Sequence, residues 1–359
     1  MAALDLSYIA APMVNQSDLP FRTLSHKYGA TLTYTQMLQP EKLINDKDYL
    51  EFHVRDLSQR PKEHQVVVQL CGNDPVVTVE GARKIQDHCD GVGGYYLNLG
   101  CPQEAAREGH FGAYLLGQRD WPTVEQIGML LPTFFFDAHC SSVCSLSHSL
   151  AVPVSVKLRL CQPLEKTLVL AQRLEANGAS WITLHARTVS ARRRRNGPAD
   201  LLQVRALKEN LRVPVISNGN VRVWSDIQSN LDYTGANGVM VGETLLGNPC
   251  IFSGTVPDPV DISLEYLQLC RDYPDTATFP TIQTHIRHFV DFQCGRKPWY
   301  QKFRAALGSC CDADDVERML RTKVGRWRGK SARSDNDPEV EEESVPSGSS
   351  DNVYLSLLG

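Results

Sequence analysis

The alternation of short apolar runs with amphipathic stretches constrains this chain most. Runs rich in β-branched residues recur eight times in the first 250 residues, at 8–13, 31–35, 65–70, 91–98, 153–159, 181–185, 213–217 and 238–241. Helical patterns such as 164–177 and 221–231 separate most of these runs. Eight β units with intervening helices predict an α/β fold, a (β/α)8 TIM barrel. A doubly wound sheet is the alternative, but no G-x-G-x-x-G motif follows the first run.

The 359 residues suffice for one such barrel and a small additional domain. We expect the barrel to occupy residues 1–255. Residues 256–330 carry helical patterns without a strong strand pattern, which predicts a C-terminal helical domain. Residues 331–359 are rich in Ser, Asp and Glu, which predicts a disordered acidic tail.

Two stretches interrupt the pattern. Gly93-Gly94-Tyr95-Tyr96 falls inside the fourth run, and GMLLPTFFFDAHCSSVC at 128–144 breaks a smooth helical pattern. Strands have a period of two, so an odd insertion reverses every later side chain unless a bulge absorbs it. Both stretches therefore look inserted, and the first could displace the residues that follow it.

Charge is distributed unevenly. The formal net charge of −4 argues against a polyanionic partner, but residues 331–359 hold seven acidic residues and one basic residue. Residues 281–330 hold eleven Lys and Arg against five Asp and Glu. Two basic clusters are predicted to contact nucleic-acid phosphates. They are Arg192-Arg193-Arg194-Arg195 and the run Arg318, Arg321, Lys323, Arg326, Arg328 and Lys330 with Trp327.

Eleven cysteines without a repeating spacing, and no secretory signal, indicate reduced thiols in the cytoplasm, the nucleus or both. No apolar run reaches membrane-spanning length, so we expect a soluble protein, and we expect a monomer. His139, Cys140, Cys144 and His148 have loosely ligand-like spacing, but they fall in the second interruption. We therefore predict no metal site.

Polar residues follow the predicted strands, where TIM barrels place their functional groups. Asn218-Gly219-Asn220 and Gly242-Glu243 follow the last two strands, a common place for a phosphate site built from backbone N–H groups. Lys157 and His185 could place charge and a donor beside an electron-rich ring, and Gln69 offers a paired donor and acceptor. Each residue alone is as readily explained by solvation, a turn or a buried thiol, so only their joint occurrence carries weight.

Several motifs, in the same order, resemble those of the tRNA-dihydrouridine synthase family over roughly residues 7–255. They are Ala11-Pro12-Met13, Asn98-Leu99-Gly100-Cys101-Pro102-Gln103, Gly109-His110-Phe111-Gly112-Ala113, Lys157-Leu158-Arg159, His185-Ala186-Arg187-Thr188 and Asn218-Gly219-Asn220. The stretches 11–17 and 97–103 look most like the eukaryotic branch that acts on D-loop positions 16 and 17.

The resemblance implies an FMN-dependent reductase of uridine in tRNA, with NADPH or NADH as the reductant. Cys101 would be the general acid that protonates uracil C5. Asn98, Arg159 and Arg187 would meet the substrate. The flavin would be bound by Pro12, Met13, Gln69, Lys157, His185, Asn218, Gly219, Asn220, Gly242 and Glu243.

The chemistry of the residues agrees with that implication. Hydride addition at C6 of uracil leaves carbanion character at C5, and a thiol that is mostly protonated at neutral pH can supply the proton. The base must leave the stacked tRNA to be reached, and Tyr34, Tyr114 or Phe111 could stack on it, although a core or rim position is the more common role for an aromatic residue.

This chain also departs from the family pattern. Gly242-Glu243 stands where family members often carry Gly-Arg, so any phosphate contact there must come from backbone N–H groups. Two alternatives stay open. One is an FMN barrel that reduces a free metabolite, as a dihydroorotate dehydrogenase does, although such a substrate needs neither the helical domain nor the arginine clusters. The other is an inactive RNA-binding barrel.

Overall fold

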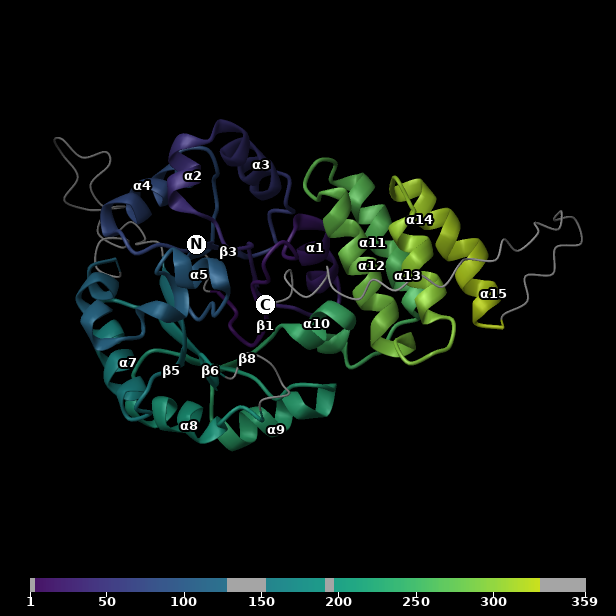
Figure 1. Cartoon of the computed structure of the whole chain (residues 1–359). Helices are drawn as coiled ribbons and strands as arrows, with labels where there is room; N and C mark the ends of the chain where they lie inside the picture. Colours follow the sequence, from purple (N-terminus) through teal and green to yellow (C-terminus); the bar gives the residue numbers. More distant parts are fainter. Residues whose placement is uncertain (1–3, 128–152, 191–196, 330–359) are drawn as a thin grey trace, which may run out of the picture.

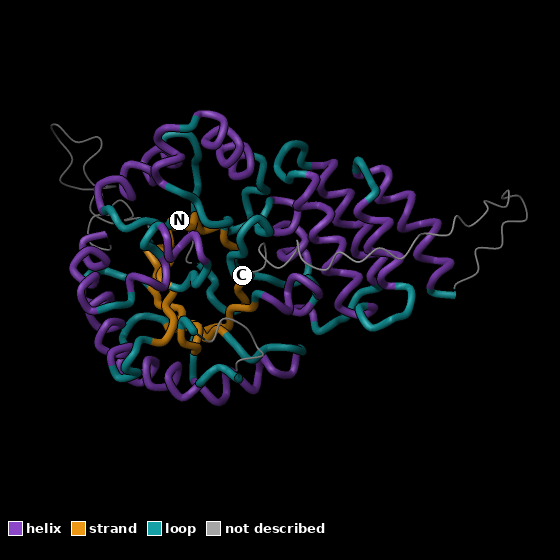
Figure 2. The backbone as a smooth tube through the Cα atoms, in the orientation of Figure 1, coloured by secondary structure: helices purple, strands orange, loops and turns teal. Residues whose placement is uncertain are grey.

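The computed structural model describes residues 4–127, 153–190 and 197–329. Eight parallel strands form one sheet in the order β1-β8-β7-β6-β5-β4-β3-β2. A bridge between Ile9 and Leu32 joins its two edges, and the Ala10 N–H donates to the Leu32 carbonyl at 2.9 Å. Figure 2 shows the strands at the centre of a ring of helices. The predicted TIM barrel is therefore confirmed.

The strands begin and end within three residues of the predicted runs. They are β1 (Tyr8–Ala10), β2 (Thr33–Tyr34), β3 (Val66–Leu70), β4 (Gly94–Leu99), β5 (Val154–Leu160), β6 (Trp181–Thr188), β7 (Val215–Asn218) and β8 (Gly238–Val241). Most strand residues are buried, as expected when the barrel interior covers one face and helices cover the other.

Helices follow the strands around the barrel. They are α1 (Leu19–Lys27), α2 (Pro40–Asn45), α3 (Lys47–Ser58), α4 (Pro75–Gln86), α5 (Glu104–Glu108), α7 (Lys166–Ala176), α8 (Leu201–Asn210), α9 (Trp224–Thr234) and α10 (Glu243–Gly247). Several begin where the sequence provides a cap. The Asp18 and Asp74 carboxylates accept from the N–H groups of Phe21 and Val77, and a proline follows each cap.

The helices after the barrel form a bundle beside it, drawn in green and yellow in Figure 1. They are α11 (Pro259–Asp272), α12 (Phe279–Cys294), α13 (Tyr300–Gly308), α14 (Ala313–Met319), one π-helical turn (Leu320–Val324) and α15 (Gly325–Trp327). Here and below, the bundle means these elements. Their apolar faces pack on each other and on α1, for example through Phe21, Tyr266 and Phe289.

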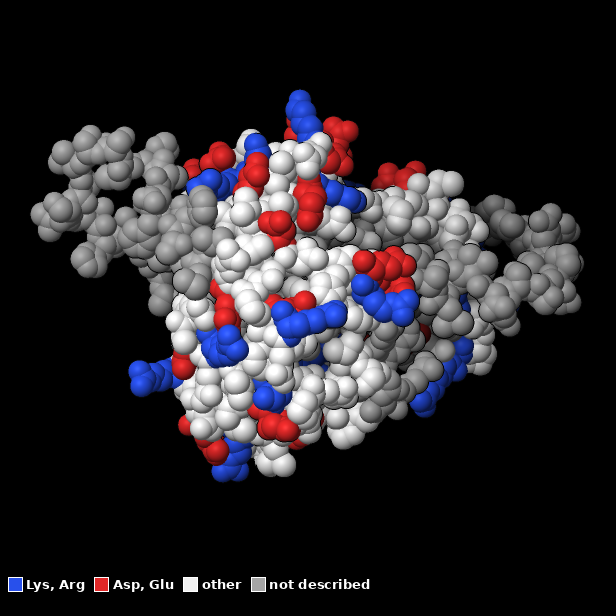
Figure 3. Space-filling model, turned by 60° about the vertical axis from the view of Figure 1, so that its left-hand side comes forward, with Lys and Arg blue, Asp and Glu red and all other residues white. Residues whose placement is uncertain are grey.

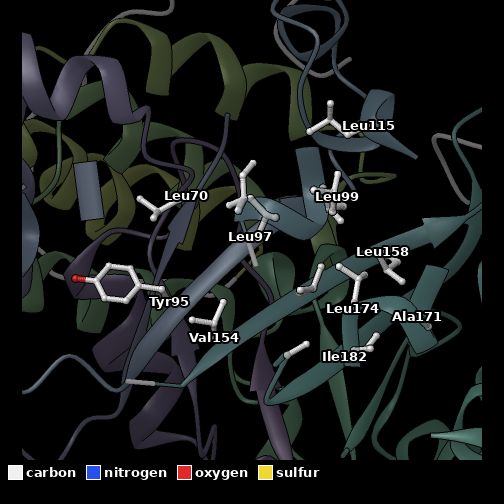
Figure 4. Close-up of a cluster of buried hydrophobic side chains, with 14 of the residues drawn as sticks. Leu70, Tyr95, Leu97, Leu99, Leu115, Val154, Leu158, Ala171, Leu174 and Ile182 are labelled. Atoms are coloured by element: carbon white, nitrogen blue, oxygen red, sulfur yellow. The ribbon is translucent and has the colours of Figure 1, made fainter. Parts of the chain in front are cut away.

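Two layers of buried apolar side chains stabilise the barrel, one inside it and one between its strands and the surrounding helices. Inside it, Tyr34, Tyr96 and Trp181 fill the centre, and the Trp181 indole N–H donates to the Tyr34 hydroxyl at 3.1 Å. Outside it, strand residues pack under the helices, as the close-up in Figure 4 shows for Leu97, Leu158 and Leu174. The packed centre closes the barrel beneath the rim that the carboxyl ends of the strands form.

The first predicted interruption does not disturb the sheet. Strand β4 begins at Gly94 and pairs without a break with Val67–Leu70 on one side and Val154–Leu158 on the other. The expectation of an insertion that displaces later residues was therefore wrong. Glycine is needed because a Cβ on Gly94 would lie 2.7 Å from the Pro153 carbonyl oxygen.

Several predictions fall outside the described residues. They concern the second interruption at 128–144, the possible ligands His139, Cys140, Cys144 and His148, the cluster Arg192–Arg195, Lys330 and the tail 331–359. Within the described part of the chain, no helix has the length and apolar character needed to cross a bilayer.

The basic run near the end of the bundle is largely paired with acidic residues. Arg328 binds the Asp258 carboxylate through both terminal nitrogens at 2.7 and 2.8 Å, and Arg321 binds Glu317 at 2.7 Å. Arg318 binds Asp315. On the face shown in Figure 3, basic and acidic side chains are likewise interspersed. This pairing weakens the case for that run as a phosphate contact.

We expect Gly94→Ala to lower the free energy of unfolding by about 1–3 kcal/mol, because the added methyl group overlaps the Pro153 carbonyl. Gly308→Ala is the matched control, since a Cβ there would meet no atom within 4 Å. Chemical denaturation of the two variants measures the difference. Equal stability of both variants would contradict the close packing at the start of β4.

Candidate active site

A cavity of about 1780 Å³ opens where the strands end and extends to the bundle. All fourteen site residues predicted from the sequence line it, although they come from seven of the eight strand ends or the loops that follow them. They are Pro12, Met13, Gln69, Asn98, Cys101, Lys157, Arg159, His185, Arg187, Asn218, Gly219, Asn220, Gly242 and Glu243. The fold thus brings these residues together, while the role of each stays a prediction.

Asn98 holds the segment that carries Cys101. Its side-chain oxygen accepts from the backbone N–H groups of Gly100 and Cys101, both at 2.9 Å. Its amide nitrogen donates to Gln69 Oε1 at 2.6 Å, and the Gln69 amide nitrogen donates to the Thr35 carbonyl at 3.2 Å. Asn98 therefore ties the ends of β3 and β4 together and places the thiol at a defined point on the rim.

The Gly109–Ala113 motif supports the same segment from the other side. The Ala113 N–H donates to the Cys101 carbonyl at 3.0 Å. Gly112 has φ +64°, and a Cβ there would lie 2.9 Å from the Cys101 oxygen and 3.0 Å from its Cβ. Only glycine permits this approach, which links the two sequence motifs physically.

Cys101 is 9% exposed. Burial raises its pKa above the ordinary value, although a backbone hydrogen bond from Gln103 and the charges of Lys157 and Arg159 act in the opposite direction. A raised pKa keeps the thiol protonated at neutral pH. Cys101 is therefore suited to donate a proton rather than to attack as a thiolate.

Two basic groups face the same cavity. Burial, reinforced by Arg159, lowers the pKa of Lys157 to about 7, and none of the described hydrogen bonds or ion pairs involves its ammonium group. The His185 pKa is well below its usual value because of burial and the nearby charges of Lys157, Arg159 and Arg187. Arg187 donates to His185 Nε2 at 3.1 Å, so the neutral ring carries its proton on Nδ1.

The loop after β7 is held in an unusual backbone conformation. Gly219 has φ +134°, and a Cβ there would lie 2.6 Å from the Ala199 Cβ. Asn220 has φ +58°, and its side chain both accepts from the Ala199 N–H at 2.7 Å and donates to the Ala199 carbonyl at 2.8 Å. This loop and the turn at Gly242 form one end of the cavity.

Arg159 and Arg187, which we predicted to meet the substrate, also brace the loops of the rim. Arg159 donates to the carbonyls of Gly100 at 2.8 Å and Thr188 at 3.0 Å. Arg187 donates to the Gly197 carbonyl at 3.1 Å. Both side chains are at least nine-tenths buried. Each lines the cavity, so substrate contact stays a prediction for both.

The aromatic residues proposed to stack on a base do not line the cavity. Tyr34 is buried inside the barrel, where its hydroxyl accepts from Trp181, so it has the core position that is the more common role for an aromatic residue and does not stack on a base. Tyr114 and Phe111 are likewise absent from the cavity wall, which instead contains Tyr96 and Phe52. Strand and helix geometry decides which face each ring occupies, and the sequence does not give it.

The sequence analysis missed the wall contributed by the bundle. Helices α12 and α13 contribute polar and basic side chains, including Thr281, Thr284, Arg287, His288, Gln301 and Arg304. The bundle contributes no acidic side chain to the described lining. Among the described residues, no hydrogen bond or ion pair engages the guanidinium groups of Arg287 and Arg304. The excess of basic residues at 281–330 was the only signal in the sequence.

Known proteins resemble this chain over most of its length. A family model described as dihydrouridine synthase matches residues 9–336. The chain is 35% identical over 279 residues to the mouse protein named tRNA-dihydrouridine(16/17) synthase [NAD(P)(+)]-like, covering 78% of this chain and 54% of that one. It thus spans about half the length of that relative.

Other relatives are covered more fully. The chain is 34% identical over 311 residues to the Saccharomyces cerevisiae tRNA-dihydrouridine(16/17) synthase [NAD(P)(+)], covering 84% of this chain and 68% of that one. A human protein named tRNA-dihydrouridine(20a/20b) synthase [NAD(P)+]-like is 31% identical over 266 residues, with 72% of this chain and 76% of that one covered.

Among solved structures, a 2-naphthoyl-CoA reductase complex superposes with a TM-score of 0.53 at 9% identity. The match covers 68% of this chain and 48% of that chain. At this identity, the likeness extends to the fold alone.

We expect Lys157→Met to stabilise the ligand-free chain at pH 7, because it removes a poorly solvated cation that has no partner among the described residues. The wild-type pKa is lowered on folding, so the penalty is complete below about pH 7 and decreases as pH rises toward 10.5. The stability gained by the variant should therefore be largest at pH 6–7 and should shrink by pH 10. Urea denaturation across this range measures it, and a gain independent of pH would contradict the assignment.

Proposed function

Because the chain belongs to the dihydrouridine synthase family, we propose that it reduces the C5–C6 bond of a tRNA uridine, using FMN and either NADPH or NADH. The mouse and S. cerevisiae 16/17 proteins, at 35% and 34% identity, are more similar to this chain than the human 20a/20b protein at 31%, which favours D-loop positions 16 and 17 as the target. The substrate places the enzyme in the cytoplasm, the nucleus or both.

The observation that carries the proposal is a buried thiol, whose pKa is raised by that burial, fixed on the rim of a cavity that also holds Lys157 and His185. Reduction of uracil needs a proton at C5 on the face opposite the hydride. Asn98 and Gly112 hold the Cys101 backbone from two sides, so the thiol can deliver that proton from a constant position.

The residues present fit an FMN group. When bound, reduced FMN would supply the hydride for uracil C6. The unpaired ammonium of Lys157 suits the negative charge of a reduced isoalloxazine ring, and Gln69 and the neutral His185 provide hydrogen-bonding groups. Pro12 and Met13 line the same cavity, and a Cβ on Gly242 would lie 3.3 Å from Met13 Sδ.

The phosphate end of FMN would lie against the loops after β7 and β8. Gly219 and Gly242 carry no Cβ, and at Gly219 the backbone passes so close to Ala199 that any side chain would collide. Asn218, Asn220 and Glu243 complete this end of the cavity. Since the Glu243 carboxylate repels phosphate, we assign the contact there to its backbone.

The bundle wall suits the RNA strand. A uridine stacked in folded tRNA must be extruded to reach Cys101, and its flanking phosphates then pass the mouth of the cavity. Arg287 and Arg304 supply positive charge there, as the predicted helical tRNA-binding domain requires. The cavity, at about 1780 Å³, has room for a flavin and a base together, and a free metabolite would not need the basic bundle wall.

The decisive experiment compares purified wild-type chain with Cys101→Ala. We expect the wild type to bind FMN, turn yellow, and form dihydrouridine in tRNA that lacks it when NADPH is supplied. Removal of the general acid should lower the rate of dihydrouridine formation by about 10²–10⁴-fold while FMN content is retained.

Cys161→Ala is the matched control, since Cys161 is also a buried thiol after a strand but does not line the cavity. It should keep the wild-type rate. A colourless wild-type chain that cannot take up FMN would refute the proposed enzyme, and full activity of Cys101→Ala would refute its role as the acid.

Substitution of Arg287 and Arg304 by Ala should weaken tRNA binding and lower the salt dependence of binding by about one phosphate each. Flavin reduction by NADPH without tRNA should be unchanged. Binding titrations at several salt concentrations measure the effect. Arg205→Ala, on the outer helix α8 where Arg205 pairs with Glu209, is the control and should bind tRNA as the wild type does. An unchanged salt slope in the double variant would contradict the assignment.

A further inference from the structure

One buried polar contact joins the bundle to the barrel beside the cavity. His285 of α12 is fully buried, and its Nε2 donates to Asp18 Oδ2 at 2.8 Å. Asp18 Oδ1 accepts from the Tyr266 hydroxyl of α11 at 3.1 Å and from the Phe21 N–H at 3.0 Å. His285 Nδ1 has no hydrogen-bond partner in the described structure. Asp18 is therefore the single polar anchor of the His285 ring.

The same carboxylate ends the loop that lines the cavity. Residues 13–18 all contribute to the cavity wall. The Met13 N–H donates to the Ser17 hydroxyl at 2.8 Å, and Arg22 donates to the Ser17 carbonyl at 2.7 Å. Arg22 in turn forms an ion pair with Asp56 at 3.0 Å. Asp18 thus connects a loop braced within the barrel to a helix of the bundle.

His285 also sets the rotation of α12. Successive helical residues turn by about 100°, which places Thr281, Thr284 and His288 between about 40° and 100° to one side of His285. All three line the cavity. The Phe21 ring stacks on the His285 ring with centroids 4.4 Å apart, which fixes the ring plane as well. A rotation of α12 that aims these residues into the cavity therefore requires His285 to face Asp18.

We propose that Asp18 and His285 are positioning residues that align the bundle wall of the cavity with the loop at 13–17, and so present the RNA strand to Cys101. The inference rests on the proposed function. A second polar contact between α1 and α11 lies nearer the surface. Lys27 and the Tyr28 hydroxyl bind Glu265 at 2.6 and 2.7 Å, but this group is partly exposed and Glu265 does not line the cavity.

The test uses the full chain with His285→Leu, His285→Gln and Glu265→Gln. The Leu variant removes the donor at similar size, the Gln variant keeps an N–H donor, and the Glu265 variant weakens a contact at the same interface away from the cavity. We measure kcat/KM for tRNA, bound FMN, and the rate of flavin reduction by NADPH in the absence of tRNA.

We expect His285→Leu to lower kcat/KM for tRNA by about tenfold or more, because small misplacements of a bound substrate cost this much. Bound FMN and the rate of flavin reduction should stay within about twofold of the wild type. His285→Gln should recover most of the loss, and Glu265→Gln should behave as the wild type does. A general structural role would instead lower FMN binding and both rates together, and that result would overturn the proposal.

Asp18→Ser keeps the test decisive if His285→Leu does not fold, because Ser caps α1 as well as Asp does, while its single hydroxyl cannot replace both carboxylate oxygens and so leaves His285 without its partner. It should also lower kcat/KM for tRNA selectively, and wild-type behaviour would overturn the proposal. A wild-type chain that reduces no uridine would refute the proposed function itself. An active wild type with an unaffected His285→Leu would refute only the positioning role.

Discussion

Closure of the parallel sheet is the constraint on which this structure depends. An open edge would leave backbone N–H and C=O groups unpaired, and the bridge between Ile9 and Leu32 closes the ring. Once closed, a parallel barrel must place all eight carboxyl ends on one rim. Residues as distant in the chain as Met13 and Glu243 then line one cavity without any direct attraction between them.

The rim uses polar side chains chiefly to hold its own backbone. Asn98, Asn220 and Arg159 each bind backbone groups of neighbouring loops, so the polar groups of these loops are satisfied without filling the cavity. Lys157 is the exception, because its charge faces the cavity and is poorly solvated. A rigid site that holds a poorly solvated cation is prepared for an anionic or electron-rich ligand.

The bundle forms the part of the cavity wall that the barrel does not. Its wall adds basic residues that a small metabolite would not need, and its orientation depends on buried contacts at α1, where Asp18 and Phe21 meet His285. The barrel alone therefore explains the chemistry that the chain can perform. The junction with the bundle explains how a large substrate could be recognised by the same cavity.

The sequence by itself determined the eight strands, the bundle helices and the residues at the strand ends, because period-two and period-3.6 patterns and short motifs are local. It misjudged Gly93-Gly94, because the need for glycine at Gly94 comes from the distant Pro153 carbonyl. It left open whether Tyr34 stacks on a base or packs in the core, where the barrel interior encloses it. It did not identify Arg287, Arg304 or the Asp18–His285 contact. Only the tertiary structure decided these, since they depend on which faces of segments far apart in the chain are packed together.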